Sequence, residues 1–128
     1  MADLPQIPDI QDYHAHVYFD ADSCEPAQAL RDEIEATFDI EMGHWHEKEV
    51  GPHPRWSYQV KFGTQQFAEI VPWLMQHRRG LTIFLHPNTS HDLEDHRDWP
   101  TWMGEMIPLK LAMFEKQFPT SGARHEGT

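Results

Sequence analysis

Histidine is the residue type in this sequence with the clearest capacity for chemistry. Ten of the 128 residues are histidine, several times the ordinary usage. His14 and His16 alternate in the segment YHAHVYF, and His86 follows the apolar segment LTIFL. Imidazole nitrogens bind Zn, Fe, Cu and Ni, and three imidazoles that leave a coordination position open are typical of a catalytic metal site. The function of these three rings depends on where the fold places them.

The elements that must position the rings follow from the spacing of apolar residues. Alternating and β-branched apolar residues predict strands, whereas apolar residues every three to four positions predict helices. The predicted strands are 13–19, 41–50, 56–62 and 81–85, and the predicted helices span about 24–38, 64–80 and 108–118. This βαββαβ order with an extra C-terminal helix predicts an α+β, ferredoxin-like sandwich, with two helices on one face of an antiparallel sheet.

Strand geometry is expected to bring the three histidines together. Side chains alternate between the faces of a strand, so the first strand places His14, His16 and Tyr18 on one face. The last strand places Phe84 and His86 on the same face, because its other apolar residues must meet the helices. In a ferredoxin-like sheet these two strands pair antiparallel, so the end of one lies beside the start of the other. The three imidazoles are therefore predicted to converge.

Two further histidines lie in restrained or acidic surroundings. His53 lies between two prolines in GPHP, which limit its backbone. His96 follows Asp95, whose carboxylate could orient the ring or raise its pKa. An ordinary loop position would equally explain either one.

Aromatic side chains could line a substrate pocket above the histidine face. Packing in the core or at a dimer contact is the alternative for several of them. The candidates are Tyr18, Trp56, Phe84 and Trp102.

Composition limits the classes of protein that fit. A mass of 15.1 kDa with 39% hydrophobic residues predicts one domain at 13–118, between an extended arm at 1–12 and a flexible tail at 119–128. Ten Lys and Arg against 21 Asp and Glu give a net charge of −11, which argues against nucleic acid or an anionic membrane as partner. The apolar stretches are too short for a membrane span. We expect no secretory signal, and the single cysteine favours a reducing cytoplasm.

The histidine segments resemble those of the DOPA 4,5-dioxygenase family of small ring-cleaving enzymes. The matching segments are YHAHVYF (13–19), GPHPRW (51–56), PWLMQHRRGLTIFLHPNT (72–89) and DHRDWPTWMG (95–104). The resemblance implies extradiol cleavage of a catechol such as L-DOPA by O₂ at a non-haem Fe(II), in a ferredoxin-like homodimer. The residues that it carries over are His14, His16, His53, His86 and His96. In the implied chemistry His14, His16 and His86 are candidate ligands with His53 a fourth, and His96 or His53 is the candidate acid–base residue.

With the resemblance included, three functions remain open. The first is an Fe(II) dioxygenase; its usual ligand set is two histidines and a carboxylate, but no carboxylate stands out and a three-histidine site is possible. The second is a non-catalytic dimer that binds a metal or small ligand through the same cluster, and the third is a structural module with solvated histidines. Metal content separates the third from the others, and oxygen consumption with a catechol separates the first two. A homodimer is expected because large open faces seldom stay uncovered.

Overall fold

Five strands form one antiparallel sheet in the computed structural model, which describes residues 7–117. The strands are β1 (Asp12–Phe19), β2 (Glu41–Met42), β3 (Trp56–Gly63), β4 (Thr82–Asn88) and β5 (Thr101–Met103). They lie in the order β2-β3-β1-β4-β5. The first four have the ferredoxin-like arrangement, so the predicted α+β fold class is confirmed. The fifth strand extends the sheet beyond β4.

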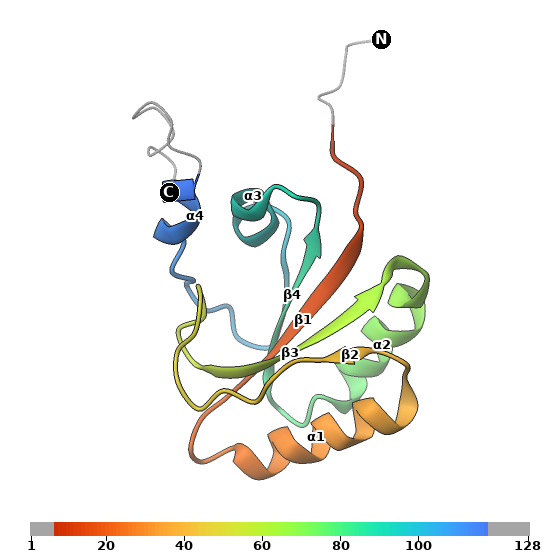
Figure 1. Cartoon of the computed structure of the whole chain (residues 1–128). Coiled ribbons are helices and arrows are strands. Elements are labelled where there is room, and N and C mark those ends of the chain that lie inside the picture. The colour runs from red at the N-terminus through yellow and green to blue at the C-terminus, as the bar shows by residue number, and fades with distance from the viewer. Residues whose placement is uncertain (1–6, 118–128) are drawn as a thin grey trace.

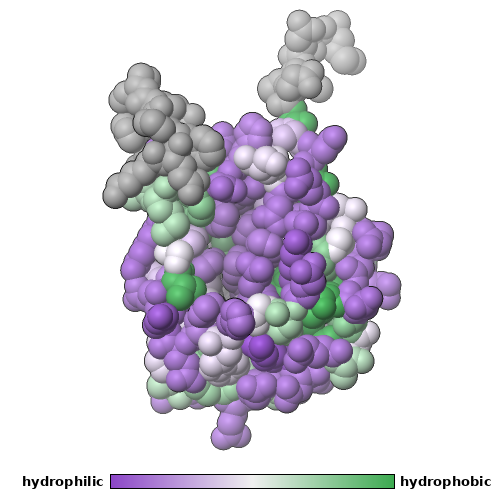
Figure 2. Space-filling model, viewed as in Figure 1, coloured by the Kyte–Doolittle hydropathy of each residue, from purple (hydrophilic) through white to green (hydrophobic). Residues whose placement is uncertain are grey.

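Helices lie on both sides of this sheet (Figure 1). One face is covered by α1 (Cys24–Thr37) and α2 (Phe67–His77), and α2 is preceded by the 3₁₀ turn η1 (Thr64–Gln66). The short helices α3 (Asp92–Arg97) and α4 (Ala112–Gln117) lie on the opposite side. Figure 2 shows that hydrophilic residues occupy most of the surface in this view. Within residues 7–117, no helix has the length and apolar character needed to cross a membrane.

The main core lies between the sheet and the helices α1 and α2. Ala15, Val17 and Phe19 alternate along β1 and pack in one cluster with Leu30 and Ile34 of α1. All five side chains are at most 3% exposed. Burial of apolar surface stabilises a fold by roughly 25 cal/mol per Å². This face therefore supplies most of the hydrophobic stabilisation.

The predicted strand at 41–50 is mostly absent. Only Glu41 and Met42 form a ladder with β3, and one isolated bridge joins His46 to Ser57. The charged residues at 47–49 are exposed, and charges on an edge segment oppose continued pairing. The segment instead forms a loop that brings His53 to the histidine face.

The region after β4 also differs from the expectation of a polar loop. Helix α3 and strand β5 form there, and α4 begins at Ala112 rather than at residue 108. The predicted tail at 119–128 and the first half of the predicted arm lie outside the described residues. The described part of that arm, residues 7–11, contains neither helix nor strand.

Candidate functional site

Three histidines meet where β1 and β4 pair. The strand register places His14 directly opposite His86, and His16 lies two residues further along the same face of β1. One nitrogen from each ring lies within 4.8 Å of the others, and the Nε2 atoms of His16 and His86 are 3.0 Å apart. His16 and His86 are buried, whereas His14 is half-buried. His14 therefore marks the accessible side of the cluster.

The geometry of these nitrogens fits a shared metal ion. Two imidazole nitrogens bound to one ion at about 2.1 Å, at right angles to each other, lie roughly 3 Å apart. The Nε2 atoms of His16 and His86 have this separation, at which the two rings form a hydrogen bond without a metal. The Nδ1–H of His86 donates to the carbonyl oxygen of Pro87 at 2.9 Å, which leaves Nε2 unprotonated, as a ligand must be. The candidate metal-binding cluster found in residues 7–117 contains only imidazoles, a donor set that suits Fe, Zn, Cu or Ni.

Burial keeps the three imidazoles neutral. Loss of solvation lowers the pKa of His16 well below its usual value, and the nearby rings of His53 and His86 lower it further. Desolvation also lowers the pKa of His86 to about 2. It lowers the pKa of His14 as well, although the charge of Asp12 opposes this shift. At neutral pH each ring is therefore neutral, and metal binding by His16 requires the tautomer that carries its proton on Nδ1.

His53 reaches the cluster from the loop before β3. Its ring centroid lies 4.1 Å from that of His16, and a 2.6 Å hydrogen bond joins its Nδ1 to the Tyr18 hydroxyl. Gly51 permits the loop because it adopts a φ of +53°, a conformation that favours glycine. Desolvation lowers the pKa of His53 to about 4 and raises that of Tyr18. The pair is thus neutral and lies beside the candidate ligands.

His96 reaches the cluster from α3. Its ring centroid lies 4.1 Å from that of His86, and its Nδ1–H donates to the carbonyl oxygen of Asp92 at 2.7 Å. The expectation that Asp95 orients this ring is wrong, because the Asp95 carboxylate accepts hydrogen bonds from Thr89 instead. The pKa of His96 is lowered rather than raised, since desolvation outweighs the opposing effects of Asp92 and Asp95.

The contact between Thr89 and Asp95 was missed by the sequence analysis. Asp95 is only 1% exposed, and it accepts from the Thr89 backbone N–H at 2.9 Å and from its hydroxyl at 2.6 Å. These bonds join the end of β4 to α3 and so hold His96 beside His86. The sequence offered one signal for this contact, which is that both residues lie close to candidate site histidines. Thr89 follows His86 by three residues, and Asp95 immediately precedes His96.

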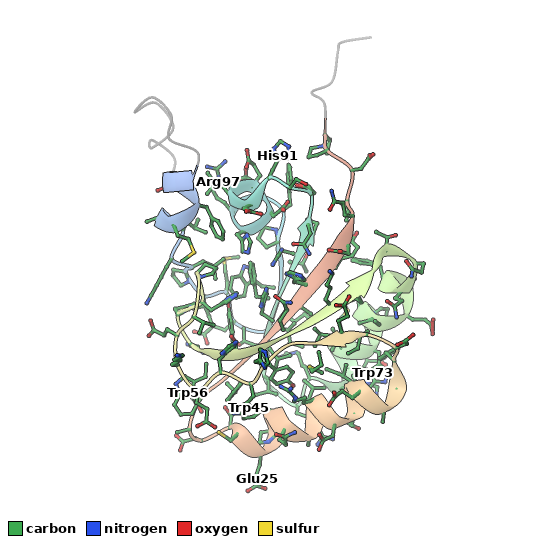
Figure 3. The ribbon with its side chains drawn as sticks, in the orientation of Figure 1. Glu25, Trp45, Trp56, Trp73, His91 and Arg97 are labelled. Atoms are coloured by element: carbon green, nitrogen blue, oxygen red, sulfur yellow. The ribbon has the colours of Figure 1, made fainter. Side chains whose placement is uncertain are left out.

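Three of the four candidate aromatic residues lie on the histidine face. Tyr18, Phe84 and Trp102 belong to a small apolar cluster there. Trp56 does not reach it: its register opposite Phe19 places it on the face covered by α1 and α2. In Figure 3, Trp56 accordingly lies toward the start of α1 and far from α3. Strand parity could have shown this, because Trp56 belongs to the same alternate set of β3 as the buried Tyr58, Val60 and Phe62.

The fold and the cluster define a class of protein: a ferredoxin-like α+β domain that carries a three-imidazole candidate metal centre on one sheet face. Comparison with known proteins places the chain more closely. The model of the Dopa 4,5-dioxygenase family matches residues 13–113. The chain belongs to this family, as its histidine segments predicted.

Two curated proteins match over most of this chain. DOPA 4,5-dioxygenase of Amanita muscaria is 31% identical over 113 residues, which cover 81% of this chain and 50% of that protein. An uncharacterized 21.2 kDa protein of Botryotinia fuckeliana is 29% identical over 116 residues, which cover 81% of this chain and 63% of that protein. The chain thus spans half of the first relative and less than two thirds of the second.

One solved structure is similar to this chain over nearly the whole length of the solved chain. It is the crystal structure of a Nostoc punctiforme protein whose proposed activity is that of a dioxygenase. The two chains are 42% identical with a TM-score of 0.81, and the match covers 84% of this chain and 93% of the other. The fold described above is therefore shared with a solved relative.

Proposed function

We propose that this protein is a dioxygenase that cleaves a catechol ring in the extradiol manner with O₂ and a non-haem Fe(II). His14, His16 and His86 are the proposed ligands. The observation that carries the proposal is the convergence of their nitrogens within 4.8 Å in a chain of the Dopa 4,5-dioxygenase family. L-DOPA is the first substrate to test, since the Amanita relative is named for it.

The donor set suits this chemistry. Bound Fe(II) would supply electron transfer between a catechol and O₂, and three protein ligands on one side leave coordination positions for both reactants. Both oxygen atoms enter the ring-opened product of a dioxygenase, so no external reductant is required. The apolar cluster of Tyr18, Phe84 and Trp102 excludes water from the buried side of the site.

Two neutral imidazoles support proton transfer beside the ligands. His96 has an unprotonated Nε2, because its Nδ1–H is donated to the Asp92 carbonyl. We assign His96 as the residue that accepts a proton from a catechol hydroxyl and later returns it. His53 is the second candidate for this role, and it is held in place by its hydrogen bond to Tyr18.

The proposal includes a homodimer in a reducing, cytoplasmic setting. A mostly apolar groove of about 400 Å³ lies beside β4, and four large hydrophobic side chains that line it are exposed: Ile7, Ile10, Phe67 and Trp99. Exposed apolar grooves of this kind are typical of subunit contacts. A reducing compartment would preserve Fe(II) and suits the free thiol of Cys24.

Anaerobic reconstitution with Fe(II), followed by air and L-DOPA or a simpler catechol, tests the proposed function. We expect stoichiometric oxygen uptake and the visible absorbance of a ring-opened semialdehyde. His16→Ala should abolish both signals, whereas His91→Ala, a change at an exposed histidine beside α3 (Figure 3), should leave them unchanged. Tight iron binding without uptake for any catechol would instead indicate a non-catalytic binding protein. Absence of iron binding would indicate a structural module.

A further inference from the structure

Lys61 is the only lysine or arginine in the five strands of the sheet, and it lies in line with the histidine cluster. The strand registers place His86 opposite His14, His14 opposite Lys61, and Lys61 opposite Glu41. Directly opposite residues of antiparallel strands project from the same face. The Lys61 ammonium therefore lies on the histidine face, next to the most accessible of the three proposed ligands.

The ion pairs of Lys61 leave its ammonium able to bind a further group. Its Nζ lies 3.7 Å from a carboxylate oxygen of Asp12 and 3.8 Å from one of Glu41, and both distances exceed that of a hydrogen bond. Asp12 also accepts a 2.6 Å hydrogen bond from the amide of Asn88. The Glu41 side chain is 79% exposed, so its pairing with Lys61 is weak.

Lys61 also lines a polar cavity of about 420 Å³, whose lining includes none of the three histidines. Asp12, Asp39 and Glu41 line the same cavity, so three carboxylates surround one ammonium. An anion entering at random is repelled by this arrangement and by the net charge of −11. A carboxylate on the substituent of a bound ring meets the same repulsion. Its binding therefore depends on direct contact with Lys61, the cation of this lining.

We propose that Lys61 is a specificity-determining residue that binds a carboxylate on the ring substituent of the catechol. The two ring oxygens would lie at the cluster of His14, His16 and His86, and the substituent would extend along the row toward β3. This inference rests on the proposed function and names the group that the same site selects. The half-exposed position of Lys61 allows its side chain to meet the substituent without disturbing the core.

Four catechols with matched substituents test the role of Lys61. L-DOPA carries a carboxylate and an ammonium, 3-(3,4-dihydroxyphenyl)propionate only the carboxylate, dopamine only the ammonium, and 4-ethylcatechol neither. Oxygen uptake by the iron-loaded protein gives kcat and KM for each compound. We expect Lys61→Met to raise KM for the two carboxylates about tenfold, with kcat within about twofold. The KM for 4-ethylcatechol should not change. The KM for dopamine should not rise, because the variant leaves Asp12 and Glu41 without a competing ammonium.

Two further variants separate binding from a structural effect. Lys61→Arg keeps the charge and should restore most of the affinity for the two carboxylates. Lys110→Met removes an exposed cation that pairs with Glu49 away from the sheet and should change none of the constants. An equal change for all four catechols, no change for the carboxylates, or a loss confined to dopamine would overturn the role of Lys61. No oxygen uptake by the unmodified protein with any of the four would overturn the proposed function, and this inference with it.

Discussion

The two faces of the sheet are built by the same strands but from different chemistry. On the helix-covered face, Ala15 and Val17 are fully buried among other apolar side chains, whereas on the opposite face His16 and His86 are nearly as buried, at 5% and 1% exposed. Burial of aliphatic groups stabilises the fold. Burial of imidazoles disfavours their charged forms, which is why their pKa values are lowered. The comparison indicates that one face supplies most of the hydrophobic stabilisation and the other carries the candidate metal centre.

Among changes on the histidine face, loss of a proposed ligand should have the largest effect, and that effect is on iron affinity. We expect His86→Ala to lower iron affinity more than about 100-fold while the protein remains folded, because the aliphatic core lies on the other face. Metal content after gel filtration measures the first effect, and circular dichroism measures the second. Full iron occupancy in this variant would remove His86 from the ligand set.

Truncation in the core should have the converse effect. Leu30 is fully buried between α1 and the sheet, so we expect Leu30→Ala to reduce the free energy of unfolding by about 3 kcal/mol. Iron binding should persist while the variant is folded. Met75, which is 55% exposed on α2, offers the matched control, since Met75→Ala should change stability by less than about 0.5 kcal/mol. Equal losses from Leu30→Ala and Met75→Ala, measured by urea unfolding, would contradict the assignment of the core.

Acid should destabilise the metal-free protein through its histidine face. Desolvation lowers the pKa of His53 from 6.5 to about 4, so the unfolded state binds more protons between these values, and stability falls as the pH falls through this window. By pH 5 this single group lowers the free energy of unfolding by roughly 2 kcal/mol relative to pH 7. His53→Gln should therefore lose less stability between pH 7 and pH 5. Identical pH profiles for both proteins would show that His53 does not titrate on unfolding.

The smallest expected effects distinguish two tryptophans on opposite faces. Trp102 lines a groove of about 350 Å³ together with His96, so we expect Trp102→Leu to raise the KM for a catechol about threefold. Trp56 packs on the helix-covered face, and Trp56→Phe should leave that KM unchanged. A larger change from Trp56→Phe than from Trp102→Leu would reverse the assignment of the two faces to substrate and core.

Local alternation in the sequence was sufficient to predict much of the sheet and the central histidine cluster. In YHAHVYF, one set of alternate residues is apolar and the other contains His14 and His16. A strand must turn its apolar set toward the helices, so the direction of the imidazoles followed from parity alone. The same rule applied to the strand that ends at His86, and antiparallel pairing placed the two strands side by side. The same parity argument, applied to β3, would also have removed Trp56 from the site.

Contacts between segments without a repeating pattern were decided only by the tertiary structure. The sequence predicted the turn at GPHP but not which part of the sheet the turn contacts. In the fold this turn places the His53 ring against the His16 ring. It also pairs Asp95 with Thr89 rather than with the adjacent His96. Periodicity determines which face of a strand or helix is buried, because that choice is repeated along the element. The path of a loop and the partner of a buried carboxylate depend on packing between distant segments, and no local repeat in this sequence encodes them.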